Sequence, residues 1–155
     1  MSYLIETKKI TSKYTDYNKH MNMAYYVMIF DLSWEIILAK FQMGENAAKT
    51  INRSTMVVET HTTYDSEVLE DEEVDISLTY LNHDKKRLHF KLQMIKKNNN
   101  QLAATIEMIS LYIDLEKRKV TEFEKEKITL IDNFINENKK NFDTSKLVLS
   151  SKIKN

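Results

Sequence analysis

Four consecutive segments of this chain alternate apolar and polar residues with a period of two, and this pattern constrains the fold more than any other feature. The segments span residues 55–64, 73–80, 87–94 and 102–109. A period of two is typical of strands with one buried face, and the short connections between the segments predict hairpins. One connection is the run Asn98-Asn99-Asn100, and asparagine tolerates the left-handed backbone that tight turns require. The pattern therefore predicts an antiparallel sheet.

A long helix is expected ahead of this sheet. Apolar residues recur over residues 24–40 at the spacing of a largely buried helix, and Asn22 is the expected N-cap. Gly44, the only glycine, stands where a helix C-terminal glycine is expected, and a polar connection follows over residues 46–53.

The two ends of the chain complete the expected architecture. Residues 3–11 are expected to form a first strand, and residues 123–140 show helical spacing around Ile128, Ile131 and Ile135. That second helix is expected to pack on the outside, and the polar last fifteen residues to be loosely held. A strand, a long helix and a four-strand meander form an α+β order, in which one face of the sheet must wrap around the helix.

Composition excludes several functions. The chain has 155 residues, no cysteine, no proline and equal numbers, 23 each, of basic and acidic residues. Neutrality argues against bulk binding to nucleic acid or to a membrane surface, and the single glycine excludes glycine-rich phosphate loops. The lack of cysteine removes thiol nucleophiles and fits a reducing compartment. With no membrane-spanning run and no signal-peptide pattern at the N-terminus, we expect a cytoplasmic protein.

The run from Asp16 to Asn22 places a carboxylate and the imidazole of His20 just ahead of the long helix. The first N–H groups of a helix lack intrahelical partners and carry partial positive charge, so they can hold an oxyanion. We expect the N–H groups of residues 22–25 to form this oxyanion site. The combination indicates acyl chemistry.

Three motifs resemble a known family. The segment Asp16-Tyr17-Asn18-Lys19-His20-Met21-Asn22 resembles the Asp-Tyr-Asn-Gly-His-Met-Asn motif of hotdog-fold thioesterases, in the branch that includes the betainyl-CoA thioesterases of carnitine degradation. The segment Glu59-Thr60-His61-Thr62-Thr63-Tyr64 resembles the Glu-x-His-x-x-Tyr strand of that branch. The run from His83 to His89 resembles its His-Asp-x-Lys-Arg-Leu-His hairpin. The resemblance covers residues 5 to about 122.

The resemblance implies a fold and an activity. It implies a hotdog domain over residues 1–122, with a curved antiparallel sheet around a central helix, and a C-terminal helix and tail of the same domain over residues 123–155. It also implies an acyl-CoA thioesterase, with CoA entering as part of the substrate, and a homodimer or a dimer of dimers. One departure is Lys19, which stands where the branch usually has glycine and would strain the loop if φ is positive there.

The catalytic roles follow from thioester chemistry. Asp16 could attack the carbonyl to form a mixed anhydride or act as general base on water, and the sequence leaves both routes open. Its alternative role is to cap a turn or the helix. His20 is expected to orient Asp16, water or the carbonyl. Asn22 is expected either to position water or to serve as the N-cap.

Substrate contacts are expected from aromatic and polar side chains. Aromatic faces attract quaternary ammonium groups, which fits a betaine acyl group, although aromatic residues on a buried helix also form the core. Asp31 and Glu35, one helical turn apart, offer a second means of meeting a cation. Glu59 and His61 share a strand face and could line the cleft or a dimer interface. The expected aromatic contacts are Tyr17, Tyr25, Tyr26, Trp34 and Tyr64.

A basic cluster at Lys85, Lys86 and Arg87 suits the phosphates of CoA, although charged hairpins are often merely solvated. No metal-binding spacing is present, so no metal is expected.

Betainyl-CoA is the leading substrate that the resemblance implies. The alternatives are another short-chain or aromatic acyl-CoA or an acyl carrier protein thioester and, from a different class, a non-catalytic acyl-CoA-binding module.

Overall fold

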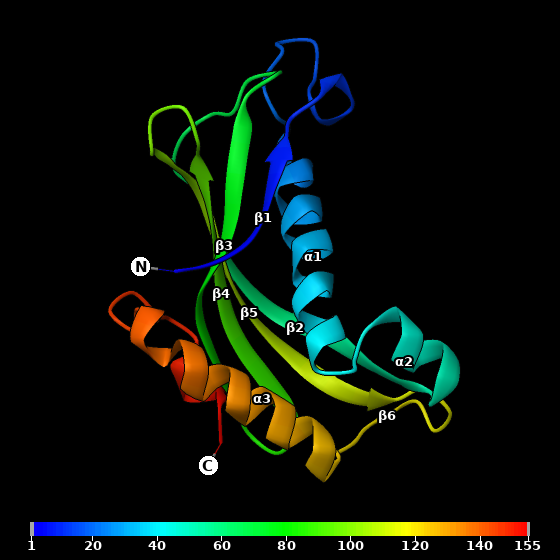
Figure 1. Ribbon diagram of the computed structural model, residues 1–155. Coiled ribbons are helices and arrows are strands. Elements are labelled where there is room, and N and C mark those ends of the chain that lie inside the picture. Colours follow the sequence, from blue (N-terminus) through cyan, green and yellow to red (C-terminus); the bar gives the residue numbers. More distant parts are fainter. Residues whose placement is uncertain (1, 155) are drawn as a thin grey trace.

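A curved antiparallel sheet is the framework of the computed structural model, which describes residues 2–154 (Figure 1). The strand order is β1-β3-β4-β5-β2, and the short β6 pairs with β5. The four alternating segments correspond to β2–β5, so the predicted meander is confirmed. The strand bounds are β1 Tyr3–Lys9, β2 Arg53–Tyr64, β3 Glu73–His83, β4 Arg87–Lys96, β5 Leu102–Asp114 and β6 Lys119–Val120.

Helix α1 (Met23–Lys40) lies on the concave face of the sheet and forms the centre of the core (Figure 1). Its buried face includes Phe30, Trp34 and Ile37. The Trp34 ring stacks on Phe90 of β4 with centroids 3.6 Å apart. Burial of each large apolar side chain contributes about 1.5–3 kcal/mol, so this face fixes the helix against the sheet. The α+β hotdog architecture is confirmed.

The region after α1 differs from the expected polar connection. Gly44 does not end α1. It has φ 93° and is the N-cap of a second helix, the short α2 (Glu45–Thr50), while the left-handed residue at the end of α1 is Gln42, which follows the C-cap Phe41 and has φ 56°. The sequence rule misassigned the glycine because α1 ends through a non-glycine residue in the left-handed conformation.

A bulge in β2 changes which residues share a face. The pairing of β2 with β5 shifts register between Val57 and Glu59. Val57 lines a hollow beside α1 together with Thr60, whereas Glu59 pairs with Lys152 of the C-terminal tail on the opposite, convex face. Val57 and Glu59, which strict alternation would place on one face, therefore lie on opposite faces, because a bulge adds one residue to the alternation.

Helix α3 (Lys125–Asn138) packs against the core near β1. Ile131 is fully buried, and Phe134 contacts the rings of Tyr3 and Phe41. The residues on either side of position 122 thus contribute to one core. Within residues 2–154, no helix is both long and apolar enough to cross a membrane.

The C-terminal tail is fastened to the convex face, so the expectation of a loosely held end is wrong. The Glu107 carboxylate accepts hydrogen bonds from the N–H groups of Val148 and Leu149, at 2.9 and 2.8 Å. Near the end of the tail, the Lys154 N–H donates to Asp84 at 2.9 Å. Polar composition did not reveal this attachment because backbone N–H groups of any residue can bond to a buried carboxylate.

Candidate active site

The loop that precedes α1 is folded by a tight turn at Asp16. The Lys19 N–H donates to the Asp16 carbonyl at 3.0 Å, and the Asn18 N–H donates to Asp16 Oδ1 at 2.8 Å. Lys19 has φ 60°, so the position where the resembling branch has glycine does require a left-handed backbone. A non-glycine residue there is strained by about 1 kcal/mol.

This turn leaves one Asp16 oxygen facing the His20 ring. Asp16 Oδ2 lies 3.5 Å from His20 Nε2, and the other ring nitrogen, Nδ1, lies 3.5 Å from Glu67 Oε2. The three side chains are partly exposed, at 26%, 37% and 64% respectively. The imidazole is therefore flanked by two carboxylates that solvent and substrate can reach. Sequence reasoning missed Glu67, because only the pairing of two distant loops brings it here.

Backbone bonds hold the two loops together. The segment of residues 65–72, which connects β2 to β3, lies along the loop before α1. The Met21 N–H donates to the Val68 carbonyl at 2.7 Å, and the Glu70 N–H donates to the Lys19 carbonyl at 3.0 Å. These bonds fix the position of Glu67 relative to His20.

A hollow of about 530 Å³ opens beside His20. The Tyr26 hydroxyl donates to the Ser66 carbonyl at 3.2 Å, and its ring contacts that of Tyr64 edge-on. Burial raises the pKa of Tyr26, so its hydroxyl remains a proton donor at neutral pH. This is a site with one aromatic wall and one titratable wall. Its lining residues are His20, Met21, Met23, Tyr26, Tyr64, Asp65, Ser66 and Glu67.

The N–H groups at the start of α1 are mostly occupied. Asn22 Oδ1 accepts a hydrogen bond from the Ala24 N–H at 3.0 Å. Asn22 is therefore the N-cap, which is one of the two roles expected for it. The N–H groups of Asn22 and Tyr25 donate to backbone carbonyls. In the described part of the chain the Met23 N–H has no acceptor, and Met23 borders the hollow. Of the expected oxyanion donors, this one is free for a substrate oxygen.

The aromatic residues expected at the substrate separate into three groups. Tyr26 and Tyr64 line the hollow beside His20. Tyr25 packs edge-on against Tyr14, and Tyr17 is 92% exposed at the loop tip. Trp34 is 3% exposed within the core, so its expected substrate contact is wrong. Helical spacing alone does not distinguish a core aromatic from one that lines a cleft.

Glu59 and His61 do share a face of β2, but the face is the convex one. His61 borders a hollow formed with residues 145–148 of the tail, and Glu59 Oε2 lies 3.5 Å from Lys152 Nζ. Asp16 and the start of α1 lie on the other side of the sheet. The expectation that Glu59 and His61 line the same cleft as Asp16 is therefore wrong within one chain.

The basic cluster lies at the β3–β4 hairpin, at the opposite end of the sheet from the loop that carries Asp16 (Figure 1). Arg87 Nη1 donates to Asp84 Oδ2 at 3.1 Å, which partly neutralises it. Lys85 and Lys86 border a surface hollow of about 360 Å³. Within one chain, the hairpin and Asp16 cannot contact the same small ligand group.

Another hollow, of about 350 Å³, lies between the first turns of α1 and the sheet. Its walls are almost entirely apolar, and its one ionisable residue is Asp31. Burial raises the pKa of the nearby Glu35 carboxyl, and repulsion from Asp31 raises it further, which indicates a negative local potential. The lining residues are Ala24, Val27, Met28, Asp31, Val57, Thr60, Ile106 and Met108.

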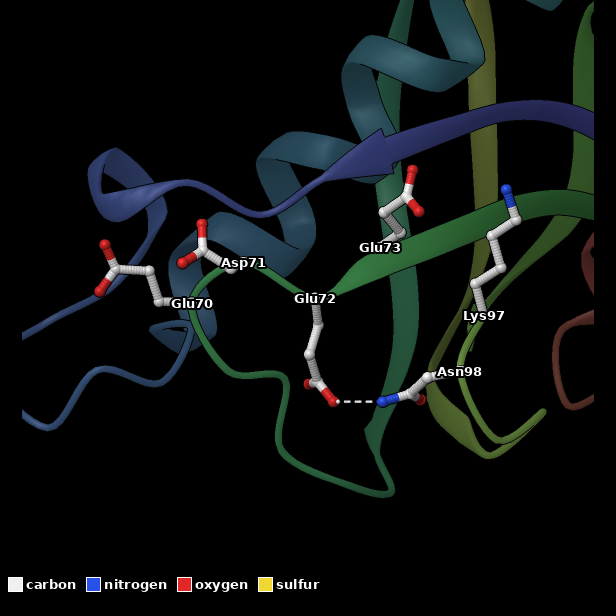
Figure 2. A pocket seen from close by; sticks show the side chains of 6 residues that line it. All are labelled: Glu70, Asp71, Glu72, Glu73, Lys97 and Asn98. Atoms are coloured by element: carbon white, nitrogen blue, oxygen red, sulfur yellow. Dashed lines mark hydrogen bonds between the residues drawn. The ribbon is translucent and has the colours of Figure 1, made fainter.

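An acidic hollow of about 520 Å³ lies at the start of β3 (Figure 2). Figure 2 shows the Glu72 carboxylate bonded to Asn98, with the Glu70 and Asp71 carboxylates pointing elsewhere. Glu72 is also paired with Lys96 at 3.0 Å. Across residues 2–154, no group of three or more acidic, histidine or cysteine side chains is arranged to hold a metal ion.

A curved antiparallel sheet wrapped around a central helix defines the hotdog fold. The chain belongs to the thioesterase-like superfamily, whose model matches residues 10–134. It is thus a thioester hydrolase, as the sequence predicted.

Individual relatives agree with this family. The chain is 25% identical to a betainyl-CoA thioesterase of Pseudomonas aeruginosa over 134 residues, which cover 85% of this chain and 84% of that protein. A Staphylococcus aureus protein solved in complex with CoA is 26% identical, with a TM-score of 0.82 over 100% of this chain and 96% of that one. A 1,4-dihydroxy-2-naphthoyl-CoA thioesterase from Synechocystis has a TM-score of 0.75 at 12% identity, covering 86% of this chain and 97% of that one.

Proposed function

We propose that this protein hydrolyses a small acyl-CoA thioester, with betainyl-CoA as the preferred substrate. The observation that carries the proposal is the Asp16 carboxylate beside His20 at the start of α1, next to the hollow lined by Tyr26 and Tyr64. The CoA complex of the Staphylococcus aureus relative supports CoA as the carrier.

The site has the parts that thioester hydrolysis requires. Asp16 either attacks the carbonyl carbon, expelling the CoA thiolate and leaving an anhydride for water to hydrolyse, or removes a proton from the attacking water. The Met23 N–H stabilises the oxyanion in either route. His20 holds the carboxylate through Oδ2.

The hollow around Asp31 supports a cationic acyl group. A trimethylammonium group is apolar at its surface but carries a full positive charge, so it suits an apolar pocket with a single carboxylate. Val27 and Met28 supply apolar walls, and Asp31 supplies the counter-charge. The betainyl-CoA thioesterase of Pseudomonas aeruginosa gives the same indication of substrate.

A homodimer forms part of the proposal. β2 is a long edge strand with exposed Met56, Val57 and Val58, and α1 exposes Leu32 and Ile36. An exposed apolar edge of this kind favours pairing with another strand. Antiparallel pairing of two β2 strands about a twofold axis would bring the basic hairpin of the partner to the end that carries Asp16. In that arrangement the basic cluster binds CoA phosphates for the other subunit.

The experiment that tests this function measures release of free CoA from betainyl-, acetyl-, benzoyl- and long-chain acyl-CoA. We expect the highest kcat/KM for betainyl-CoA. Asp31→Asn should lower kcat/KM for betainyl-CoA at least about tenfold and leave acetyl-CoA within about twofold, because only a cationic acyl group is attracted by the carboxylate. Equal losses on both substrates would show that Asp31 does not contact the acyl group. Turnover of only another acyl-CoA would show that betainyl-CoA is not the substrate.

The oligomeric state has its own test. Wild-type protein should sediment as a dimer or a dimer of dimers, and Val58→Lys, at the exposed edge, should shift it toward monomer and lower turnover. A wild-type monomer with full activity would overturn this part of the proposal. A cytoplasmic location stays a prediction from the sequence.

A further inference from the structure

Glu67 is the side chain at this site that neither the loop motif nor the chemistry of Asp16 explains. It lies in the connection between β2 and β3, borders the hollow beside His20, and is 64% exposed. Within residues 2–154, its carboxylate makes one ion-pair contact, at 3.5 Å to His20 Nδ1. Exposed ion pairs contribute only about 0–1 kcal/mol to folding stability. Stability therefore does not explain why this carboxylate lies beside the imidazole.

The contact is built by backbone structure on both sides. Met21 follows His20 in the chain, and Val68 follows Glu67. A backbone hydrogen bond from the Met21 N–H to the Val68 carbonyl joins these two neighbours. An isolated bridge also joins His20 to Leu69. The two side chains are therefore held on neighbouring strand-like segments, and the contact does not depend on a long flexible reach.

The position of Glu67 determines how His20 can serve Asp16. A neutral imidazole has one N–H and can donate to only one of the two carboxylates, whereas a protonated imidazole donates to both. Donation to Asp16 and Glu67 together therefore requires the protonated ring, and a carboxylate at Nδ1 prevents that ring from turning its Nε2 away from Asp16. Both separations of 3.5 Å leave room to shorten when substrate displaces water, as catalytic contacts commonly do.

We propose that Glu67 is a positioning residue that binds His20 at Nδ1 and so keeps its Nε2 directed at Asp16. The role in turnover rests on the proposed thioesterase function, while the contact itself does not. Glu67 acts through His20 and touches neither the thioester carbon nor the attacking oxygen.

The chain provides a matched control in the same loop. The Glu70 side chain makes no hydrogen bond or ion pair within residues 2–154, although its backbone N–H bonds to Lys19. Glu67→Gln and Glu70→Gln thus remove the same charge from the same segment. Glu67→Asp keeps the charge and shortens the reach.

The experiment combines kinetics with nitrogen-15 spectra of histidine-labelled protein. The chain has four histidines, and His20→Asn identifies the His20 signals by their loss. We expect Glu67→Gln to lower kcat about tenfold or more with KM within about twofold, and to move the His20 Nδ1 signal. Glu70→Gln should change neither, and Glu67→Asp should recover part of kcat.

Two results would overturn the proposal. Wild-type kcat and unchanged His20 signals in Glu67→Gln would show that the carboxylate is only a solvated charge, and equal effects of Glu67→Gln and Glu70→Gln would show a general charge effect. If wild-type protein released no CoA from any substrate, the thioesterase function would fail, and the role of Glu67 in turnover with it. In that case the spectra would still decide whether Glu67 binds His20.

Discussion

Two histidine–carboxylate pairs, on opposite faces of the sheet, show how the same types of side chain can have different roles. On the concave side, Asp16 and His20 are 3.5 Å apart, with 26% and 37% of their side chains exposed. On the convex side, His89 Nε2 and Glu107 Oε1 are 2.7 Å apart, with 1% and 0% exposed.

The difference lies in what else binds each carboxylate. Glu107 accepts two further hydrogen bonds, from the N–H groups of Val148 and Leu149, and its side chain is fully buried, so substrate cannot reach its oxygens. The Asp16 side chain remains partly exposed, and its partner His20 borders a hollow. A satisfied, buried carboxylate anchors the tail, whereas an accessible one can act on a ligand. The predictions below test that distinction.

The largest expected effect is on turnover at the exposed pair. Asp16→Asn should lower kcat by about 10²- to 10⁴-fold, because an amide can neither attack the carbonyl nor accept a proton from water. Its melting temperature should stay near that of wild type. Near-normal turnover of this variant would reduce Asp16 to a turn-forming residue. Release of free CoA and thermal unfolding are the two measurements.

At the buried pair the expected effect is on stability. Glu107→Ala should lower the free energy of unfolding by about 3–5 kcal/mol, because it leaves His89 and the two tail N–H groups without an acceptor in a buried place. Glu67→Ala, at the exposed pair, should lower it by at most about 1 kcal/mol. Denaturant unfolding of both variants measures the contrast. Equal losses would show that burial does not separate the two pairs.

Acid should weaken the buried pair in a defined direction. Burial alone would raise the pKa of Glu107, but its bonds to the tail N–H groups and His89 outweigh this and hold the pKa below the ordinary value of 4.5. A lowered folded-state pKa contributes stability above pH 4.5, and that contribution is lost as pH falls through the folded pKa.

The corresponding measurement compares wild type with Glu107→Gln. As pH falls from 7 through 4.5 and on through the lowered folded pKa of Glu107, the stability of wild type should fall more than that of the variant, since an amide does not titrate. Parallel curves would show that other lowered carboxyls, such as Asp84, carry the acid dependence.

The smallest expected effect concerns the strained turn beside Asp16. Lys19→Gly should change the free energy of unfolding by at most about 1 kcal/mol, because relief of the left-handed strain is offset by the greater freedom of glycine in the unfolded chain. Turnover should stay within about twofold. A larger change in kcat would mean that the lysine reshapes the loop around Asp16.

Sequence patterns predicted much of the fold and part of the site. The period-two segments correspond to β2–β5, residues 24–40 form most of α1, and the run from Asp16 to His20 lies at the start of that helix. These features depend on neighbours within a few residues, which a sequence displays directly. Gly44 and the short α2 were misassigned because helix ends depend on the actual backbone angles.

Other features depended on tertiary structure because they join residues that are far apart in the chain. The bulge between Val57 and Glu59 decides which β2 side chains face the core, and a single added residue reverses that choice. The register of two loops brings Glu67 to His20, and the path of the tail buries Glu107. Local sequence thus determined the elements and the pair formed by Asp16 and His20, while packing decided which acids surround that pair and which are buried away from solvent.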